Sequence, residues 1–208
     1  DAQEHYDDFG ESLRLSEYRQ VCGEDLRETE RLVLERYTQA KDSIFEIGCG
    51  FFHRTAAYFL AHDLEFYGLD PLDRIVQAGK YASKTCIGSF PRDFEPAAYP
   101  RFSLSLLLGG ILNGALCQEF QNEFWQGLEV LGQKSQTIAF DSLIEIQGFN
   151  FDFEKDEKGQ AIQAFESAPP QYFPSQKELG RRCTQHGFQI VETLDDVLPM
   201  AKRRIFVL

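Results

Sequence analysis

The sequence lacks any apolar run long enough to cross a membrane. Its most apolar stretch, residues 102–116, is interrupted by Ser103, Ser105 and Asn113, whereas a membrane-spanning helix needs about 20 predominantly apolar residues. A basic start followed by an apolar segment, the pattern of a secretory signal, is also missing. We therefore expect a protein that does not associate with membranes.

Basic residues are scarce. The chain has 21 Lys and Arg against 33 Asp and Glu, which gives a net charge of −12 at pH 7. Nucleic-acid-binding proteins gain much of their affinity from clustered Lys and Arg. The two basic runs here, residues 181–182 and 202–204, are short, and we expect them to be solvated. The charge balance argues against a nucleic-acid partner.

The cysteines show no disulfide or metal-binding pattern. They are odd in number, and no two have the C-x-x-C spacing: Cys22, Cys49, Cys86, Cys117 and Cys183. Disulfide frameworks and zinc sites have paired or regularly spaced cysteines, and the four histidines also lack metal-ligand spacings. We therefore expect reduced thiols, a cytoplasmic location and no metal site.

What the sequence does contain is an alternation of strand and helix patterns in a chain of one-domain length, 208 residues. Residues 1–40 have a helical pattern rich in Glu and Arg. Short apolar runs then predict strands at 43–47, 64–69, 85–88, 102–108 and 136–141. Helical patterns lie between them at 54–61, 72–82 and 116–131. Such alternation is typical of a mostly parallel sheet covered on both faces.

The C-terminal region departs from this parallel pattern. A helix is predicted at 175–186, followed by strands at 188–193 and 204–208. Only about ten residues separate these strands, and a parallel crossover needs a dozen or more. They should therefore pair antiparallel. The expected fold is an α/β class fold: a doubly wound, mostly parallel seven-stranded sheet with an antiparallel C-terminal strand.

An insertion at 147–174 interrupts the last third of the chain. Phe149, Phe151 and Phe153 alternate with polar residues, and a polar turn containing Gly159 leads to an apolar segment at 161–165. Period-two apolar residues on both sides of such a turn predict a β-hairpin. This hairpin would form either a cap over a substrate cavity or a homodimer surface.

The first predicted strand ends in a glycine turn that suits close approach of a ligand. Gly48 and Gly50 have no side chains to block a ligand, and Asp70 ends the second strand 22 residues after Gly48. A carboxylate at that place can accept hydrogen bonds from ribose hydroxyls. Glu46, inside an apolar strand, would be costly to bury unless it is hydrogen-bonded. These residues predict a nucleoside site.

Position 53 helps to choose between nucleoside cofactors. A dinucleotide-binding turn has the pattern G-x-G-x-x-G/A, which would place Gly or Ala where this sequence has His53. The glycine that permits close packing around a pyrophosphate is missing. A phosphate-free cofactor such as S-adenosylmethionine does not need it.

A family resemblance rests on four parts of the sequence: Ile44-Phe-Glu-Ile-Gly-Cys-Gly50, Tyr67-Gly-Leu-Asp-Pro71, the strand and glycine end at 102–110, and the tail at 175–179, 187–188 and 203–206. With them the chain resembles the class I S-adenosylmethionine-dependent methyltransferases over residues 43–208. The resemblance implies one methyltransferase-like domain over residues 1–208, in which residues 1–40 form an N-terminal helical lid.

The resemblance also implies roles for individual residues. Glu46 would organise the methionine end of the cofactor, and Asp70 would hold the ribose. The turn at 89–90 would border the adenine, and the residues after the fourth strand would border the transferred methyl group. The full set of implied cofactor-binding residues is Glu46, Gly48, Cys49, Gly50, Asp70, Pro71, Leu72, Ser89, Phe90, Gly109, Gly110 and Asn113.

The implied reaction is transfer of a methyl group to an O or N atom of a small-molecule acceptor by in-line displacement. Alignment and desolvation supply much of the acceleration in such a reaction, and a general base is optional. Asp141 and Glu145, just past the predicted fifth strand, and His53, in the glycine-turn region, are the candidate catalytic groups. The two acids could equally be solvated loop residues.

Two other functions stay open. One is an NAD-dependent oxidoreductase, against which position 53 and the antiparallel C-terminus both argue. The other is a methyltransferase-like module that binds without turnover. Phe52, Ser89 and Ser103 favour it because they depart from the family pattern at a third glycine and at two acidic positions.

Overall fold

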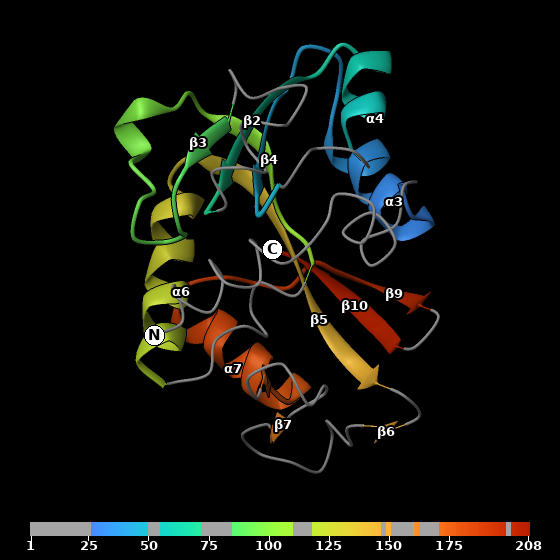
Figure 1. The fold of residues 1–208 in the computed structure, drawn as a ribbon, viewed down its shortest axis with the longest axis vertical. Helices are drawn as coiled ribbons and strands as arrows, with labels where there is room; N and C mark the ends of the chain where they lie inside the picture. Colours follow the sequence, from blue (N-terminus) through green and yellow to red (C-terminus); the bar gives the residue numbers. More distant parts are fainter. Residues whose placement is uncertain are drawn as a thin grey trace.

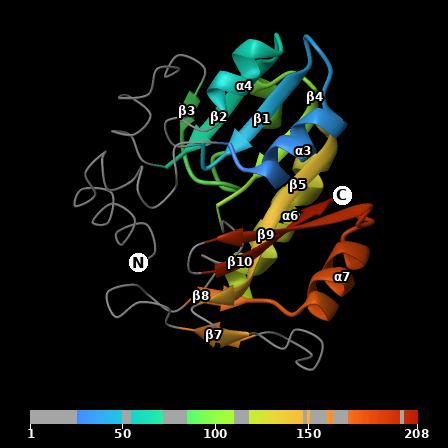
Figure 2. The same cartoon turned by 90° about the vertical axis from the view of Figure 1, so that its right-hand side faces the viewer.

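The computed structural model describes residues 26–49, 55–71, 85–109, 118–146, 149–150, 160–162, 171–198 and 201–208. In these residues the parallel part of the sheet consists of β1 Ser43–Ile47, β2 Glu65–Asp70, β3 Thr85–Ile87, β4 Phe102–Leu107 and β5 Ser135–Ile146. The C-terminal strands are β9 Glu192–Leu198 and β10 Ala201–Val207. Seven strands lie in the order β3-β2-β1-β4-β5-β10-β9 (Figures 1 and 2).

Strand direction agrees with the sequence pattern. The strands from β3 to β5 are parallel neighbours, whereas β10 runs antiparallel to both β5 and β9. The predicted fold class, a mostly parallel sheet that ends in antiparallel strands, is therefore confirmed.

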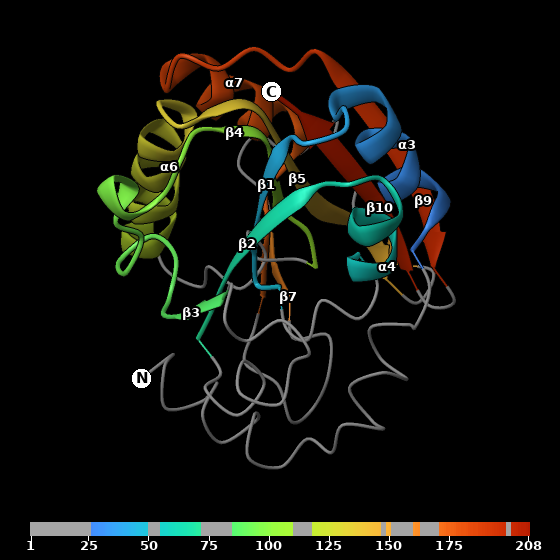
Figure 3. The same ribbon diagram turned by 90° about the horizontal axis from the view of Figure 1, so that it is seen from above.

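Helices cover both faces of the sheet (Figure 3). One face carries α3 Glu28–Tyr37 and α4 Ala56–Ala61, which pack Val33, Leu34 and Phe59 against the sheet. The other carries α6 Gln118–Gly132 and α7 Gln176–Gln185, and a short 3-10 helix, η2 Pro96–Ala98, precedes β4. Among the described residues, no helix is both long and apolar enough to cross a bilayer.

The most periodic helix pattern in the sequence is confirmed where the structure describes its side chains. Phe124, Leu128 and Leu131 of α6 are fully buried in one of the two apolar clusters of the core. The predicted helix at 72–82 and residues 1–25 of the predicted lid lie outside the described residues.

The strand predicted at 188–193 was misplaced. Phe188 and Ile190 pack against the core from a non-strand segment, and the strand is β9, residues 192–198. It was missed because its centre is acidic. Asp195 and Asp196 stand directly opposite Arg204 and Arg203 in the ladder with β10, where each carboxylate pairs with its facing arginine.

The insertion contains an antiparallel strand pair, but with partners that differ from those predicted. β5 continues to Ile146, five residues further than expected, and pairs with β6 Phe149–Asn150. β7 Gln160–Ile162 pairs with β8 Gln171–Phe173. Because the extended end of β5 pairs with Phe149 and Asn150, these two residues do not pair with β7. The remaining aromatic positions of the predicted hairpin, 151–153 and 163–165, lie outside the described residues.

The start of α7 is held by a compact polar cluster. The Ser175 hydroxyl accepts the Glu178 N–H at 3.1 Å, as an N-cap residue does. The Glu178 carboxylate accepts hydrogen bonds from Arg181 (2.8 and 2.6 Å) and from Arg182 (2.8 Å). Burial raises the pKa of Glu178, but these hydrogen bonds outweigh it, and the pKa is lowered below its ordinary value.

Replacing Glu178 by Gln should reduce the free energy of unfolding by about 1–2 kcal/mol at neutral pH, since charged hydrogen bonds are strong and Arg181 is half exposed. A carboxylate whose folded-state pKa is lowered stabilises the fold above its unfolded pKa, and this contribution is lost as pH falls through the folded pKa. The difference in free energy of unfolding between the unsubstituted protein and the Glu178→Gln variant should therefore shrink as the pH is lowered from neutral. Urea titrations at several pH values measure this difference.

The matched control is Glu123→Gln, which removes a more exposed pair with Arg92 and should cost less than about 0.5 kcal/mol. A loss of unfolding free energy in Glu178→Gln that does not change with pH would contradict the stabilising role of the ionised Glu178 carboxylate.

Candidate functional site

The glycine turn after β1 is tied to the neighbouring strand. Gly48 has φ +66°, a left-handed conformation that favours glycine. Its N–H donates to the Leu69 carbonyl at 2.8 Å. The turn predicted from the Gly-x-Gly pattern is therefore anchored on β2, but Gly50 and His53 lie outside the described residues.

Two buried carboxylates occupy the carboxyl ends of these two strands. Glu46 in β1 is 7% exposed, and Asp70, the last residue of β2, is 5% exposed. Glu46 Oε2 accepts the Thr55 hydroxyl at 2.8 Å, which links β1 to the residue that precedes α4. The Asp70 carbonyl accepts the Gly88 N–H at 2.9 Å, which ties β2 to the turn after β3. The two acids of the sequence motif thus lie at one edge of the sheet.

The pKa of the Cys49 thiol reflects the electrostatic potential at this edge of the sheet. Its thiol is buried, and its pKa is raised well above the ordinary value by burial first and then by the negative charges of Asp70 and Glu46. Both carboxylates therefore act at the same point beside the glycine turn. We call these four residues, Glu46, Gly48, Cys49 and Asp70, the acidic cluster. Its electrostatics favour a cation over an anion.

The turn after β3 forms the next side of the site. The Ser89 N–H donates to Asp93 Oδ2 at 2.7 Å. The Phe90 ring is buried, with its centroid 6.0 Å from that of Phe94 and 6.1 Å from that of Phe124 in α6. The structure places Phe90 in the core, whereas Asp93 is an exposed acid at this turn that the sequence analysis missed.

The end of β4 makes a second glycine turn. Gly109 has φ +102°, and a Cβ placed there would meet no atom within 4 Å. Glycine is therefore required by the backbone conformation and not by lack of space. Its N–H donates to Asp141 Oδ2 at 2.9 Å. Pro71 is half-buried directly after Asp70, whereas Leu72, Gly110 and Asn113 lie outside the described residues.

Asp141 differs from the solvated loop acid considered as one alternative. It lies inside β5, which extends beyond its predicted end, and it is 1% exposed. The same Oδ2 that accepts the Gly109 N–H also receives Arg203 Nη1 at 3.3 Å. Glu145 also lies in β5, opposite Lys202 of β10, and its side chain is outside the described set.

Arg203 was expected to be solvated, and this expectation was wrong. The residue is 1% exposed. Nη1 also donates to Glu30 Oε1 at 2.8 Å, and Nη2 donates to Asp196 Oδ2 at 2.7 Å and to Thr29 Oγ1 at 3.4 Å. Carboxylates from α3, β5 and β9 therefore surround one guanidinium group. The contact of Arg203 with Glu30 spans 173 residues of sequence, and a local pattern cannot show it.

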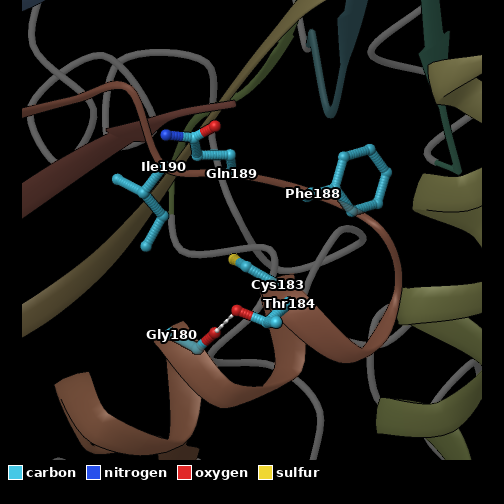
Figure 4. Close-up of a pocket in the computed structure, with 6 residues that line it drawn as sticks. All are labelled: Gly180, Cys183, Thr184, Phe188, Gln189 and Ile190. Carbon is cyan, nitrogen blue, oxygen red and sulfur yellow. Dashed lines mark hydrogen bonds between the residues drawn. The ribbon is translucent and has the colours of Figure 1, made fainter.

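An open hollow of about 370 Å³ lies between α7 and the segment that leads into β9 (Figure 4). Because β9 runs parallel to β5, the segment before β9 belongs to the amino-terminal edge of the sheet, opposite the carboxyl ends of β1 and β2. The lining residues are Gly180, Cys183, Thr184, Phe188, Gln189 and Ile190.

Comparisons with known proteins find similarity in structure alone. No family model matches the sequence, and no curated protein matches it. Among solved structures, the chain is similar to a Burkholderia thailandensis 1,6-didemethyltoxoflavin N1-methyltransferase with bound S-adenosylhomocysteine, at TM-score 0.70 and 14% identity. The alignment covers 99% of this chain and 86% of that one.

Two further structures show the same likeness. A magnesium protoporphyrin IX methyltransferase from Synechocystis PCC 6803 aligns at TM-score 0.65 and 13% identity, with 100% of this chain and 98% of that one covered. A glycopeptide N-methyltransferase aligns at TM-score 0.57 and 10% identity, with coverage of 85% and 86%. The chain therefore has the fold of the class I S-adenosylmethionine-dependent methyltransferases.

The acidic cluster leads to a prediction about the reactivity of the Cys49 thiol. The thiolate is the nucleophilic form, so the raised pKa of Cys49 should make its alkylation by iodoacetamide slow at mildly alkaline pH. The Asp70→Asn substitution removes one negative charge and should accelerate the alkylation of Cys49. Peptide mass spectrometry after timed labelling measures both rates.

Cys183 is the internal control, because burial raises the pKa of its thiol to about 12 with no acidic neighbour among the causes. Its labelling rate should not respond to Asp70→Asn. Equal acceleration at both cysteines would show general loosening of the fold and would contradict the electrostatic account.

Proposed function

We propose that the protein is an S-adenosylmethionine-dependent methyltransferase that transfers a methyl group to an O or N atom of a small-molecule acceptor. The observation that carries this proposal is the acidic cluster. Two buried carboxylates at the ends of adjacent parallel strands bracket a left-handed glycine turn. In open α/β sheets, ligands bind outside the carboxyl ends of the strands.

The position of Glu46 fits this cofactor better than a dinucleotide. S-adenosylmethionine carries positive charge at its sulfonium and amino groups and has no phosphate. Glu46 lies two residues before Gly48, so its negative charge complements a cation at the glycine turn and would repel a pyrophosphate held there. Asp70 does not discriminate, because dinucleotide-binding sheets also place an acid at this strand end to bind a ribose. Glu46 therefore favours a methyltransferase over an NAD-dependent oxidoreductase.

The residues divide the work of binding. Asp70 would accept hydrogen bonds from the ribose hydroxyls, and Glu46 would organise the amino-acid end above the turn at Gly48 and Cys49. Ser89 would border the adenine, with Phe90 supporting that turn from the core. The other positions we assign to the cofactor are Gly50, Pro71, Leu72, Gly109, Gly110 and Asn113.

The reaction requires little proton transfer by the side chains of the protein. When bound, S-adenosylmethionine supplies an electrophilic methyl group whose leaving group is a neutral thioether. The protein has to orient the acceptor in line with that methyl group and exclude water. Asp141 is occupied by Gly109 and Arg203, so we assign it to holding the turn. His53 and Glu145 remain candidates for a general base.

The setting of the reaction is also proposed. The similar structures include methyltransferases named for a toxoflavin precursor, a magnesium porphyrin and a glycopeptide, and the net charge of −12 favours an uncharged or cationic small molecule over nucleic acid. The insertion at 147–174 would cap the acceptor or form a homodimer surface, and residues 1–40 would form the lid. The reduced cysteines favour a cytoplasmic location.

Ligand binding tests this proposal directly. In thermal melts, S-adenosylmethionine and S-adenosylhomocysteine should raise the melting temperature, since a ligand at 100 times its Kd stabilises the folded state by about 2.7 kcal/mol. NAD should have no effect, because Glu46 repels its pyrophosphate and position 53 lacks the glycine of a dinucleotide-binding turn. Stabilisation by NAD alone would contradict the proposal, and no response to any of the three would favour a module that binds none of them.

Variants at the two ends of β2 locate the site. Asp70→Asn should weaken S-adenosylhomocysteine binding by about tenfold or more in calorimetric titrations, since hydrogen bonds to a charged group are worth about 1.5–3 kcal/mol. Asp63→Asn is the matched control. Asp63 is exposed near the amino end of β2 and has φ +54°, which Asn tolerates. Equal affinities in the two variants would exclude Asp70 from the site.

A further inference from the structure

The guanidinium group of Arg203 joins α3 to the turn that follows β4. On one side it binds Glu30 of α3 at 2.8 Å. On the other it binds Asp141 at 3.3 Å, through the same Oδ2 atom that accepts the Gly109 N–H at 2.9 Å. A continuous series of hydrogen bonds thus runs from α3 through β10 and β5 to the left-handed turn at Gly109.

Each link in this series is fixed by further contacts. Glu30 uses its second oxygen to accept the N–H of Arg27, at the start of α3, at 3.1 Å. Arg203 is also held by Asp196 of β9 at 2.7 Å. Gly109 has a conformation that other residues rarely adopt, so the hydrogen bond to Asp141 selects one shape of the turn. A displacement of α3 would therefore be felt at Gly109.

A gain in folding stability does not by itself explain the hydrogen bonds around Arg203. Arg203 Nε is buried without a hydrogen-bond partner, which is a cost that folded proteins rarely accept. Apolar side chains of similar volume often replace a buried ion cluster without loss of stability. Burial lowers the pKa of Arg203, but the charges of Asp141, Glu30 and Asp196 outweigh it and raise the pKa. The guanidinium therefore keeps its charge inside the protein.

We propose that Arg203 is a positioning residue for the methyl-transfer site: through Asp141 it holds the Gly109 turn, and through Glu30 it ties that turn to α3. This inference rests on the proposed function, in which the Gly109 turn borders the methyl group of the cofactor. The position of α3 then determines the conformation of the Gly109 turn, beside which the acceptor and the methyl group are aligned.

Two matched pairs of variants test the inference. Arg203→Lys keeps the charge but removes the planar fork that reaches carboxylates on opposite sides. Its control is Arg204→Lys at the next position of β10, where the arginine pairs with Asp195. Glu30→Gln weakens the link to α3. Its control is Glu28→Gln on the same helix, which loses an exposed pair with Arg31.

Two readouts distinguish positioning from general stability. The amide resonance of Gly109 in nitrogen-15 spectra reports the hydrogen bond to Asp141. The ratio of the Kd values of S-adenosylmethionine and S-adenosylhomocysteine reports the surroundings of the methyl group, because the two probes differ by that group and its charge. We expect Arg203→Lys to move the Gly109 resonance and to change the ratio by at least about threefold.

Glu30→Gln should change the Gly109 resonance and the Kd ratio in the same direction as Arg203→Lys, by smaller amounts. If Arg203→Lys does not fold, Glu30→Gln alone tests the positioning role. Both controls should leave the resonance and the ratio unchanged. A Gly109 resonance that stays in place, or two Kd values that change by the same factor, would overturn the role of Arg203. Failure of the unsubstituted protein to bind either probe would instead overturn the proposed function, and the positioning role with it.

Discussion

The parallel pairing of β1 with β2 is the constraint on which the site depends. It places Glu46 opposite Gly68, a residue with no side chain, and it brings the Gly48 N–H to the Leu69 carbonyl. Because parallel strands end at the same edge, Glu46 and Asp70 are buried close to one glycine turn. Each would be costly to bury alone. The Thr55 hydroxyl offsets part of that cost for Glu46, and the ribose hydroxyls would do so for Asp70 in the proposed complex.

The same edge is extended by the strands on the other side of β1. β4 ends at the Gly109 turn, and Asp141 in the longer β5 reaches back to hold that turn. Arg203 then connects this part of the edge to α3. One half of the edge is therefore suited to bind a cofactor, and the other half is suited to position what lies beside it. The two halves meet where β1 and β4 are neighbours.

The sequence was informative where local patterns reflect burial. Short apolar runs predicted the first five strands, and the spacing of Phe124, Leu128 and Leu131 predicted α6. It misled where distant partners change the meaning of a residue. The acids of β9 hid a strand because arginines of β10 neutralise them, and Arg203 looked solvated because its partner Glu30 is 173 residues away. The packing of the Phe90 ring against Phe124 of α6 also depends on a distant partner that the local sequence does not show.

A crystal structure of the protein with S-adenosylhomocysteine tests the central claim most directly. The account predicts that the adenosyl group lies across the carboxyl ends of β1 and β2, with both ribose hydroxyls donating to the Asp70 carboxylate and the amino-acid end near Glu46. A ligand bound elsewhere, such as the hollow beside α7, or an Asp70 carboxylate that contacts protein atoms alone, would contradict it.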